Sequence, residues 1–309
     1  MTLDPQIARY LEKLAATNPP PMSDVPVDVI RQGVRKNRLI QVQDHQVLGA
    51  GGTFTVRVFN PPAAGPLPAM VYFHGGGWVH GDIDTTDPRA RLLAEWVPCV
   101  VISVNYRKAP EHKFPAAVED AFAATAWVAD HAAELGVDPD RIGVGGDSAG
   151  GNLAAVVALM ARDRGGVPKV ALQYLCYPVT VCGRHTPSRV EKGAGFGLTH
   201  ASMQWYEAQY LRGPEDADSP LASPLLAADH GNLPPALVVV AGYDPLHDEG
   251  VDYANALQAA GNRVVLQDYS SLIHGFFSQG VESDAIKHAI ADSCGALHDL
   301  FEELSTAKT

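Results

Sequence analysis

The stretch with the clearest chemical potential is Gly146-Asp147-Ser148-Ala149-Gly150. A short apolar stretch, 141–144, precedes it and predicts a strand, while residues 151–160 predict a buried helix. A serine on a tight strand-to-helix turn, with a glycine two positions away on each side, is the arrangement that exposes a nucleophilic hydroxyl. The alternative is a glycine-rich turn that contains a serine by chance, so the rest of the chain must decide between the two.

A serine nucleophile needs a base to take its proton and an acid to orient that base. After a turn of this kind, the partners follow in the order Asp or Glu, then His. Asp244 comes shortly after the apolar stretch 237–241, and His274 follows an expected strand that ends near Gln267. Both are expected at the sheet edge where Ser148 projects, so we predict a catalytic triad of Ser148, Asp244 and His274.

Other acidic and histidine residues in these segments have structural explanations. Asp248 and Glu249 fit the first turn of a helix, where negative charge stabilises the helix dipole. Asp268 is too close in sequence to His274 to be its obvious partner, and His247 is expected to support the site from the Asp244 loop. The remaining histidines are expected on the surface or in the core, namely His185, His200, His230, His288 and His298.

Three consecutive glycines stand in His74-Gly75-Gly76-Gly77-Trp78, directly after a predicted strand. Such a run costs conformational entropy, so a compensating use is expected. A flexible loop is one explanation. The other is a set of exposed amides, because H-G-G-G after an early strand supplies oxyanion-hole donors in acyl-transfer enzymes. We expect the amides of Gly76, Gly77 and Ala149 to form this hole, with His74 holding the loop.

Apolar stretches alternate with helical patterns along most of the chain. Residues 38–60 come first and have the period of two that predicts antiparallel strands, with a turn at 49–52. The alternation predicts an α/β fold with a central, mostly parallel sheet, helices on both faces, and ligands at the carboxyl ends of the strands. The predicted strands are 69–73, 99–104, 141–145, 170–176, 237–241 and 264–267, and the predicted helices include 5–14, 26–33, 87–97, 115–135 and 284–304.

Residues 179–233 interrupt the alternation and are too long to be a simple connection. We predict that they form a helical cap together with N-terminal helices in residues 1–37. The catalytic domain then comprises 38–178 and 234–309. The substrate pocket is expected to take large side chains from the cap and the glycine loop, namely Trp78, Phe196, Met203, Trp205 and Tyr206.

The composition narrows the possible partners and location. The 309 residues include 23 basic and 35 acidic side chains, and the net charge of −12 disfavours nucleic acid and anionic membranes as partners. No metal-ligand cluster, Walker loop or convincing dinucleotide motif is found, so neither a metal nor another cofactor is expected. The N-terminus lacks a signal-peptide pattern, and the cysteines lack C-x-x-C spacing, which together predict a cytoplasmic protein with reduced thiols. A Cys176–Cys182 disulfide is possible on sequence grounds but nothing supports it.

These motifs together resemble the hormone-sensitive-lipase-like (family IV) esterases of the α/β-hydrolase fold, in the branch with G-D-S-A-G. Besides the glycine loop and the serine turn, the matching stretches are V-H-G-D at 79–82, Y-R-K-A-P-E at 106–111, F-P-A-A at 114–117, D-P-L-H-D-E-G at 244–250 and H-G-F at 274–276. The resemblance implies a serine carboxylesterase for short- to medium-chain esters, without a cofactor, and often a homodimer formed through the last strand.

Two residues depart from the family pattern. Lys108 stands where the family usually has leucine, and His247 stands where it usually has arginine. The ion pairs near Asp244 are therefore expected to differ, and a histidine there titrates near neutrality where an arginine does not.

Two other functions fit parts of this pattern. An amide or lactone hydrolase would use the same triad, and a hydrolase-fold receptor would bind a small ligand in a former active site. The receptor is expected to lack a triad member, whereas Ser148, Asp244 and His274 are all present. The function we predict is therefore a serine carboxylesterase acting on a small-molecule ester.

Overall fold

One continuous eight-stranded sheet forms the centre of the protein. The computed structural model describes residues 2–16, 40–278 and 283–306. The strand order is β1-β2-β4-β3-β5-β6-β7-β8. β2 pairs antiparallel with β1 and β4, and all other neighbours are parallel, which confirms the predicted fold class. The strands are β1 Gln41–Gly49, β2 Gly52–Asn60, β3 Leu67–Phe73, β4 Val100–Val104, β5 Val137–Asp147, β6 Leu172–Cys176, β7 Ala236–Tyr243 and β8 Val264–Ile273.

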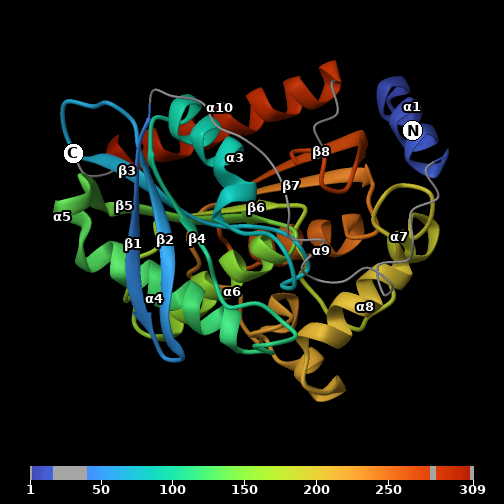
Figure 1. Cartoon of the computed structure of the whole chain (residues 1–309), viewed down its shortest axis with the longest axis horizontal. Helices are drawn as coiled ribbons and strands as arrows, with labels where there is room; N and C mark the ends of the chain where they lie inside the picture. Colours follow the sequence, from blue (N-terminus) through green and yellow to red (C-terminus); the bar gives the residue numbers. More distant parts are fainter. Residues whose placement is uncertain (1, 17–39, 279–282, 307–309) are drawn as a thin grey trace.

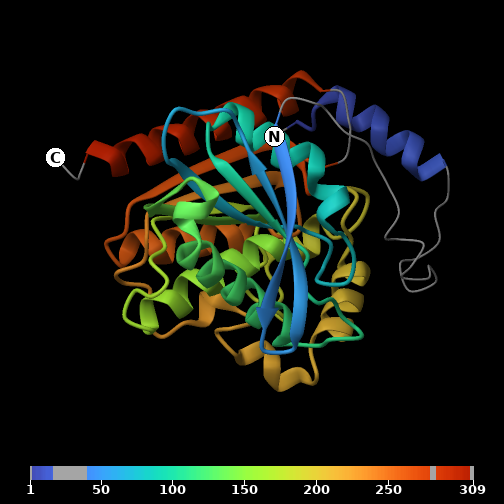
Figure 2. The same cartoon turned by 60° about the vertical axis from the view of Figure 1, so that its left-hand side comes forward.

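Helices cover both faces of this sheet (Figure 1). α3 and α10 lie on one face, and α4, α6 and α9 lie on the other, while α7 and α8 sit near one end of the sheet. Figure 2 shows the same layers from another side, with α10 running along the top of the molecule. The helices are α1 Pro5–Ala16, α3 Ile83–Trp96, α4 Ala116–Asp130, α5 Ala132–Leu135, α6 Ala149–Asp163, α7 Pro187–Glu191, α8 His200–Tyr210, α9 His247–Ala259 and α10 Asp284–Thr306.

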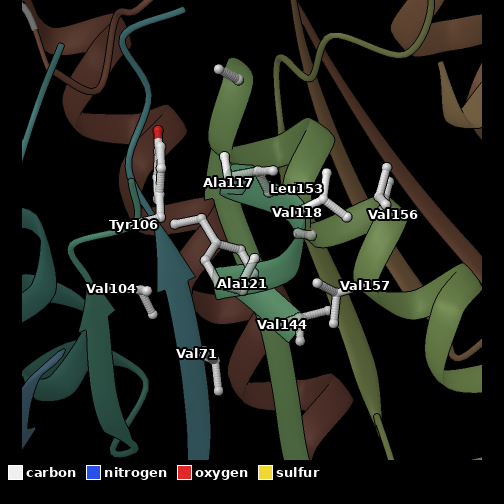
Figure 3. Close-up of a cluster of buried hydrophobic side chains, with 14 of the residues drawn as sticks. Val71, Val104, Tyr106, Ala117, Val118, Ala121, Val144, Leu153, Val156 and Val157 are labelled. Carbon is white, nitrogen blue, oxygen red and sulfur yellow. The ribbon is translucent and has the colours of Figure 1, made fainter. Parts of the chain in front are cut away.

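The central strand β3 sends alternate side chains into two buried clusters. Val71 and Phe73 belong to the cluster beneath α4 and α6, part of which is drawn in Figure 3. Met70 and Tyr72 belong to the cluster beneath α3 and α10. Because both faces are buried, the strand is a continuous apolar run rather than an alternation of apolar and polar residues.

The single long helix predicted for residues 115–135 is wrong, because the structure divides it into α4 and α5. His131 lies between them with a ψ of 14°, far from the helical value of about −42°. The carbonyl oxygen of Trp127 accepts a hydrogen bond from the backbone amide of His131, at 3.0 Å. The ring Nδ1 of His131 lies 2.9 Å from the same oxygen. Gly136 then ends α5 in the left-handed conformation, which glycine adopts without strain.

Several predicted boundaries lie inside the observed elements. α3 begins at Ile83 rather than at Asp87, because Asp82 caps it by accepting the amides of Asp84 and Thr85 at 3.0 and 2.8 Å. β5 and β8 are likewise longer than the apolar runs that predicted them: β5 extends from Val137 to Asp147, and β8 extends to Ile273, next to His274.

The N-terminal helix α1 confirms the helix predicted for residues 5–14. The amide of Asp4 donates to the carbonyl of Ser271 at 3.1 Å, and Ile7 is fully buried, so α1 packs beside the end of β8. The helix predicted for 26–33 lies outside the described residues. A capping role for residues 1–37 therefore stays a prediction.

All four cysteines are buried and unpaired, and the Cys176–Cys182 disulfide is not formed.

Candidate active site

Ser148 occupies a strained turn between β5 and α6. Its φ of 55° and ψ of −118° are costly for a residue with a side chain. A β-carbon at Gly146 would lie 2.4 Å from the carbonyl oxygen of Phe73, and one at Gly150 would lie 1.9 Å from the same atom. Only glycine permits this approach of strand and helix, so both glycines serve the placement of the serine.

Three strand ends bring the predicted triad together. Ser148 follows β5, Asp244 follows β7, and His274 follows β8. The Nε2 atom of His274 lies 3.0 Å from the Ser148 hydroxyl oxygen, and its Nδ1 lies 2.7 Å from a carboxylate oxygen of Asp244. The other carboxylate oxygen of Asp244 accepts the amide of Leu246, and the whole side chain is shielded from solvent. This is the geometry that a serine, a base and an orienting acid require.

The predicted oxyanion-hole residues lie around the same serine. Gly76 and Gly77 line the cavity that contains Ser148, and their φ angles of 114° and 58° favour glycine. Ala149 is the first residue of α6, where a backbone amide has no acceptor within the helix. Their use as donors to a reacting oxygen stays a prediction.

Asp147 braces the glycine loop. Its carboxylate accepts the hydroxyl of Tyr72 at 2.8 Å and the amide of Gly75 at 3.1 Å, and it pairs with Arg89 at 2.6 Å. Burial alone raises the pKa of Asp147, but the Arg89 charge and the hydrogen bonds outweigh it and lower the pKa. Asp147 is therefore a fixed anion that links the serine turn to the start of the glycine loop.

His74 has the contacts of a structural residue. Its Nδ1 lies 2.8 Å from the carbonyl oxygen of Gly75, and its ring stacks on Tyr106 at 4.2 Å. Burial, followed by the positive charge of Lys108, lowers the pKa of His74 to about 3. The ring is therefore neutral at physiological pH and does not exchange protons in the site.

A cavity of about 640 Å³ lies above the triad. Three of the predicted pocket residues, Trp78, Met203 and Tyr206, line it. The prediction is wrong for Phe196, whose ring packs against Tyr243, and for Trp205, which packs edge-on against Tyr206. Other lining residues were not predicted from the sequence. They include Arg89, Val179, Arg189, Leu198, Glu207 and Phe277.

A buried ion pair anchors the stretch predicted to form the cap. Arg189 of α7 lies 2.7 Å from Glu249 of α9 and 3.1 Å from Glu207 of α8. Glu249 is fully buried and also accepts the amide of Thr180 at 2.9 Å. Burial raises the pKa of Glu249, and the Arg189 charge opposes that rise. Glu249 does lie in the first turn of α9, as predicted, but its contacts are with the 179–233 segment.

His247 keeps an ion-pair bridge at the position where the resemblance leads us to expect arginine. Its Nδ1 lies 3.1 Å from Asp248 on α9, and its Nε2 lies 3.2 Å from Asp268 on β8. Hydrogen bonding to Asp268, followed by that to Asp248, raises the pKa of His247 to about 9 against the loss from burial. The side chain therefore links α9, which follows Asp244 in the chain, to β8, which precedes His274.

This bridge predicts an alkaline weakening of the fold. A raised pKa contributes stability that is complete below the ordinary value of 6.5 and is lost as the pH rises through about 9. We expect the unfolding temperature of the wild type to fall over that range, when followed by circular dichroism. The His247→Arg variant keeps its charge and should lack this component. The same alkaline decrease in both proteins, with His247→Gln also unchanged, would contradict the assignment.

Two negative findings concern the described residues alone. No group of three or more His, Cys, Asp or Glu in them is placed to hold a metal ion. Among the helices of residues 2–16, 40–278 and 283–306, none is both long and apolar enough to span a membrane.

The sheet order and the serine turn at the end of β5 define an α/β-hydrolase. The family model described as alpha/beta hydrolase fold matches residues 70–278. The chain belongs to this family, in the hormone-sensitive-lipase-like group that its motifs predict.

Named relatives extend the match over most of the chain. Carboxylic ester hydrolase LipN of Mycobacterium tuberculosis is 47% identical over 244 residues, which is 77% of this chain and 65% of LipN. An arylesterase of Saccharolobus solfataricus is 35% identical, over 89% of this chain and 92% of that protein. The solved structure of a hyperthermophilic esterase from Pyrobaculum calidifontis is 43% identical, has a TM-score of 0.90, and covers 97% of this chain and 99% of its own.

Proposed function

We propose that this chain hydrolyses carboxylic esters by forming an acyl-enzyme on Ser148. The observation that carries the proposal is the pair of hydrogen bonds that joins Ser148 to His274 and His274 to Asp244 beside the cavity. Relatives named carboxylic ester hydrolase and arylesterase support the activity. On that basis the chain is a carboxylic ester hydrolase, and the proposal concerns how it works and on which esters.

In the first half of the reaction, Ser148 attacks the carbonyl carbon of the ester while His274 takes its proton. The carbonyl oxygen becomes an oxyanion that accepts hydrogen bonds from the amides of Gly76, Gly77 and Ala149. His274 then gives the proton to the leaving alcohol as the bond between the carbonyl carbon and the alcohol oxygen breaks. The acyl group remains on Ser148.

In the second half, His274 takes a proton from water, and the water oxygen attacks the acyl carbon. The carboxylic acid leaves, and Ser148 recovers its proton from His274. Asp244 accepts the Nδ1–H of His274 throughout, which fixes the tautomer and stabilises the charged ring. Because Asp244 is fully buried, no water competes for this contact.

The cavity supports short- to medium-chain esters as substrates. Its volume of about 640 Å³ suits a small molecule, since such sites span roughly 300–1,000 Å³. Apolar side chains of Val179, Leu198 and Met203 line part of it, as an acyl chain requires. The charged lining residues Arg189 and Glu207 are paired with each other.

A fluorophosphonate probe tests the proposal directly. We expect it to phosphonylate Ser148, with the adduct located by peptide mass spectrometry, and to label Ser148→Ala not at all. The wild type should also hydrolyse p-nitrophenyl butyrate much faster than the matched anilide, because the amide has the poorer leaving group. A protein that binds esters but is not labelled would be a receptor, and comparable rates on both substrates would indicate an amide hydrolase.

We also propose a homodimer formed through β8. This strand is the last in the sheet order and has no partner beyond it among the described residues. Leu266 on β8 is 40% exposed, so this edge strand presents an apolar side chain beside its unpaired backbone, a combination that favours pairing with a second strand. Sedimentation velocity should show a dimer for the wild type and a monomer for Leu266→Lys, with Leu48→Lys on the opposite edge as the control. A monomeric wild type would contradict the proposal.

The remaining proposals concern location and partners. Four unpaired cysteines support a reducing, cytoplasmic setting. The net charge of −12 disfavours nucleic acid and an anionic membrane as partners, and the cavity beside Ser148 supports a small-molecule ester.

A further inference from the structure

The cap helix α8 contacts the glycine loop through Tyr206. A β-carbon at Gly77 would lie 2.3 Å from the Cδ1 atom of Tyr206, so the tyrosine ring lies flat against the loop. The hydroxyl of Tyr206 lies 2.9 Å from the Nε2 atom of His80. Tyr206 is 8% exposed, and this hydrogen bond fixes its ring over Gly77.

His80 belongs to the same turn as the two proposed oxyanion donors. The amides of Val79 and His80 both donate to the carbonyl of Gly76, each at 3.0 Å. A β-carbon at Gly76 would lie 2.3 Å from the carbonyl oxygen of His80 and 2.9 Å from its ring Nδ1. His80 therefore packs directly against Gly76 through both its backbone and its ring.

The loop is thus held from two sides. At its start, the amide of Gly75 donates to Asp147, which in turn pairs with Arg89. At its end, the hydroxyl of Tyr206 on α8 lies within hydrogen-bond distance of the His80 ring. The core therefore holds the first glycine. The turn that follows is held by both the core and α8, since the amide of Ala109 donates to the carbonyl of Trp78 and Tyr210 stacks on the Trp78 ring.

We propose that Tyr206 and His80 are positioning residues that hold the amides of Gly76 and Gly77 where the oxyanion forms. This inference rests on the proposed function, because it assumes that those amides bind the reacting oxygen. It follows that the cap does more than enclose the substrate, since docking of α8 completes the catalytic loop. Misplaced donors lose transition-state stabilisation and leave ground-state binding nearly unchanged.

The test is a double-mutant cycle with Tyr206→Phe and His80→Leu. Each single variant should lower kcat on p-nitrophenyl acetate and butyrate by about tenfold, and by equal factors, because both esters form the same oxyanion. KM should change by less than about twofold. The double variant should be no slower than either single variant, because both remove one hydrogen bond. His80→Gln, which keeps a donor near the Nε2 position, should recover part of the rate.

Tyr253→Phe is the matched control. Tyr253 on α9 is fully buried, and its hydroxyl has no partner among the described residues, so the same loss of oxygen should leave kcat unchanged. If Tyr206→Phe retains the wild-type kcat, the positioning role is wrong. A change in KM alone, or additive losses in the double variant, would also overturn it, by making Tyr206 a substrate contact. These results are distinct from failure of the proposed function, in which the wild type itself would not react with the fluorophosphonate.

Discussion

Replacing Ser148 with alanine is expected to lower kcat for p-nitrophenyl butyrate by roughly a millionfold, as loss of the nucleophile does in serine hydrolases of this design. The reason is that His274, 3.0 Å away, then has no hydroxyl to activate. The oxyanion donors remain and should sustain only a small residual rate. The measurement is steady-state hydrolysis at a protein concentration high enough to detect that residual rate.

Two further variants make the result specific. Ser148→Ala combined with His274→Ala should be no slower than Ser148→Ala alone, because the residues act as a unit. Ser103→Ala supplies the matched control, since Ser103 is fully buried on β4 and its hydroxyl has no partner among the described residues. The proposed mechanism is wrong if Ser148→Ala keeps more than a few per cent of the wild-type rate.

The second large effect concerns stability. Arg189→Met is expected to lower the free energy of unfolding by about 3–5 kcal/mol, the usual result of leaving one partner of a buried pair without the other. Glu249 would keep the amide of Thr180 but lose its cation. Chemical denaturation of the wild type and the variant at neutral pH measures the difference.

The loss of stability in Arg189→Met should depend on pH in a characteristic direction. Burial already raises the pKa of Glu249, and removal of Arg189 raises it further. A carboxyl whose folded pKa lies above its ordinary 4.5 binds more protons when folded, so stability falls as the pH rises above that value. The gap between variant and wild type should therefore widen from acid to neutral pH.

A double variant is the control for this prediction. Arg189→Met combined with Glu249→Gln removes both charges, and it should recover a large part of the stability that the single variant loses. A single variant within about 1 kcal/mol of the wild type, or a double variant less stable than the single one, would show that the pair does not anchor the cap segment.

That Ser148, Asp244 and His274 come together could be predicted because each position depends on a local pattern. The apolar run Leu237–Ala241 predicts a strand that is buried on both faces, and Asp244 follows shortly after the carboxyl end of that strand. Parallel strands then bring their ends to one edge, so strand order alone places Asp244 and His274 near Ser148. No pairwise contact had to be known in advance.

The pocket was harder because helix register decides which side chains face it. In α8 the buried residues are Met203, Tyr206 and Tyr210, which follow the spacing of one helical stripe. Trp205 lies off that stripe, so the helical periodicity of the sequence places it outside the pocket lining. The size and aromatic character of Trp205 favour a pocket residue, but these properties say nothing of the direction in which the side chain points.

The buried pair of Arg189 and Glu249 had no local signal in the sequence. Arg189 is a charged residue in an insertion, where exposure is the ordinary expectation. Its burial depends on Glu249, which lies 60 positions away in the chain, and on Glu207 in another helix. The periodicity of a sequence shows which face of one helix or strand is buried. It does not show which residue of a distant helix will pair with a given side chain.

The positions of the three triad residues in the sheet make the site a reporter of folding yield. Ser148 and His274 are separated by 126 positions, and they meet only when β8 has paired with β7. A reagent that captures the activated serine therefore counts only those molecules in which the final strand is in place. In a preparation, the moles of reagent consumed per mole of protein measure the fraction of chains in which β8 has joined the sheet.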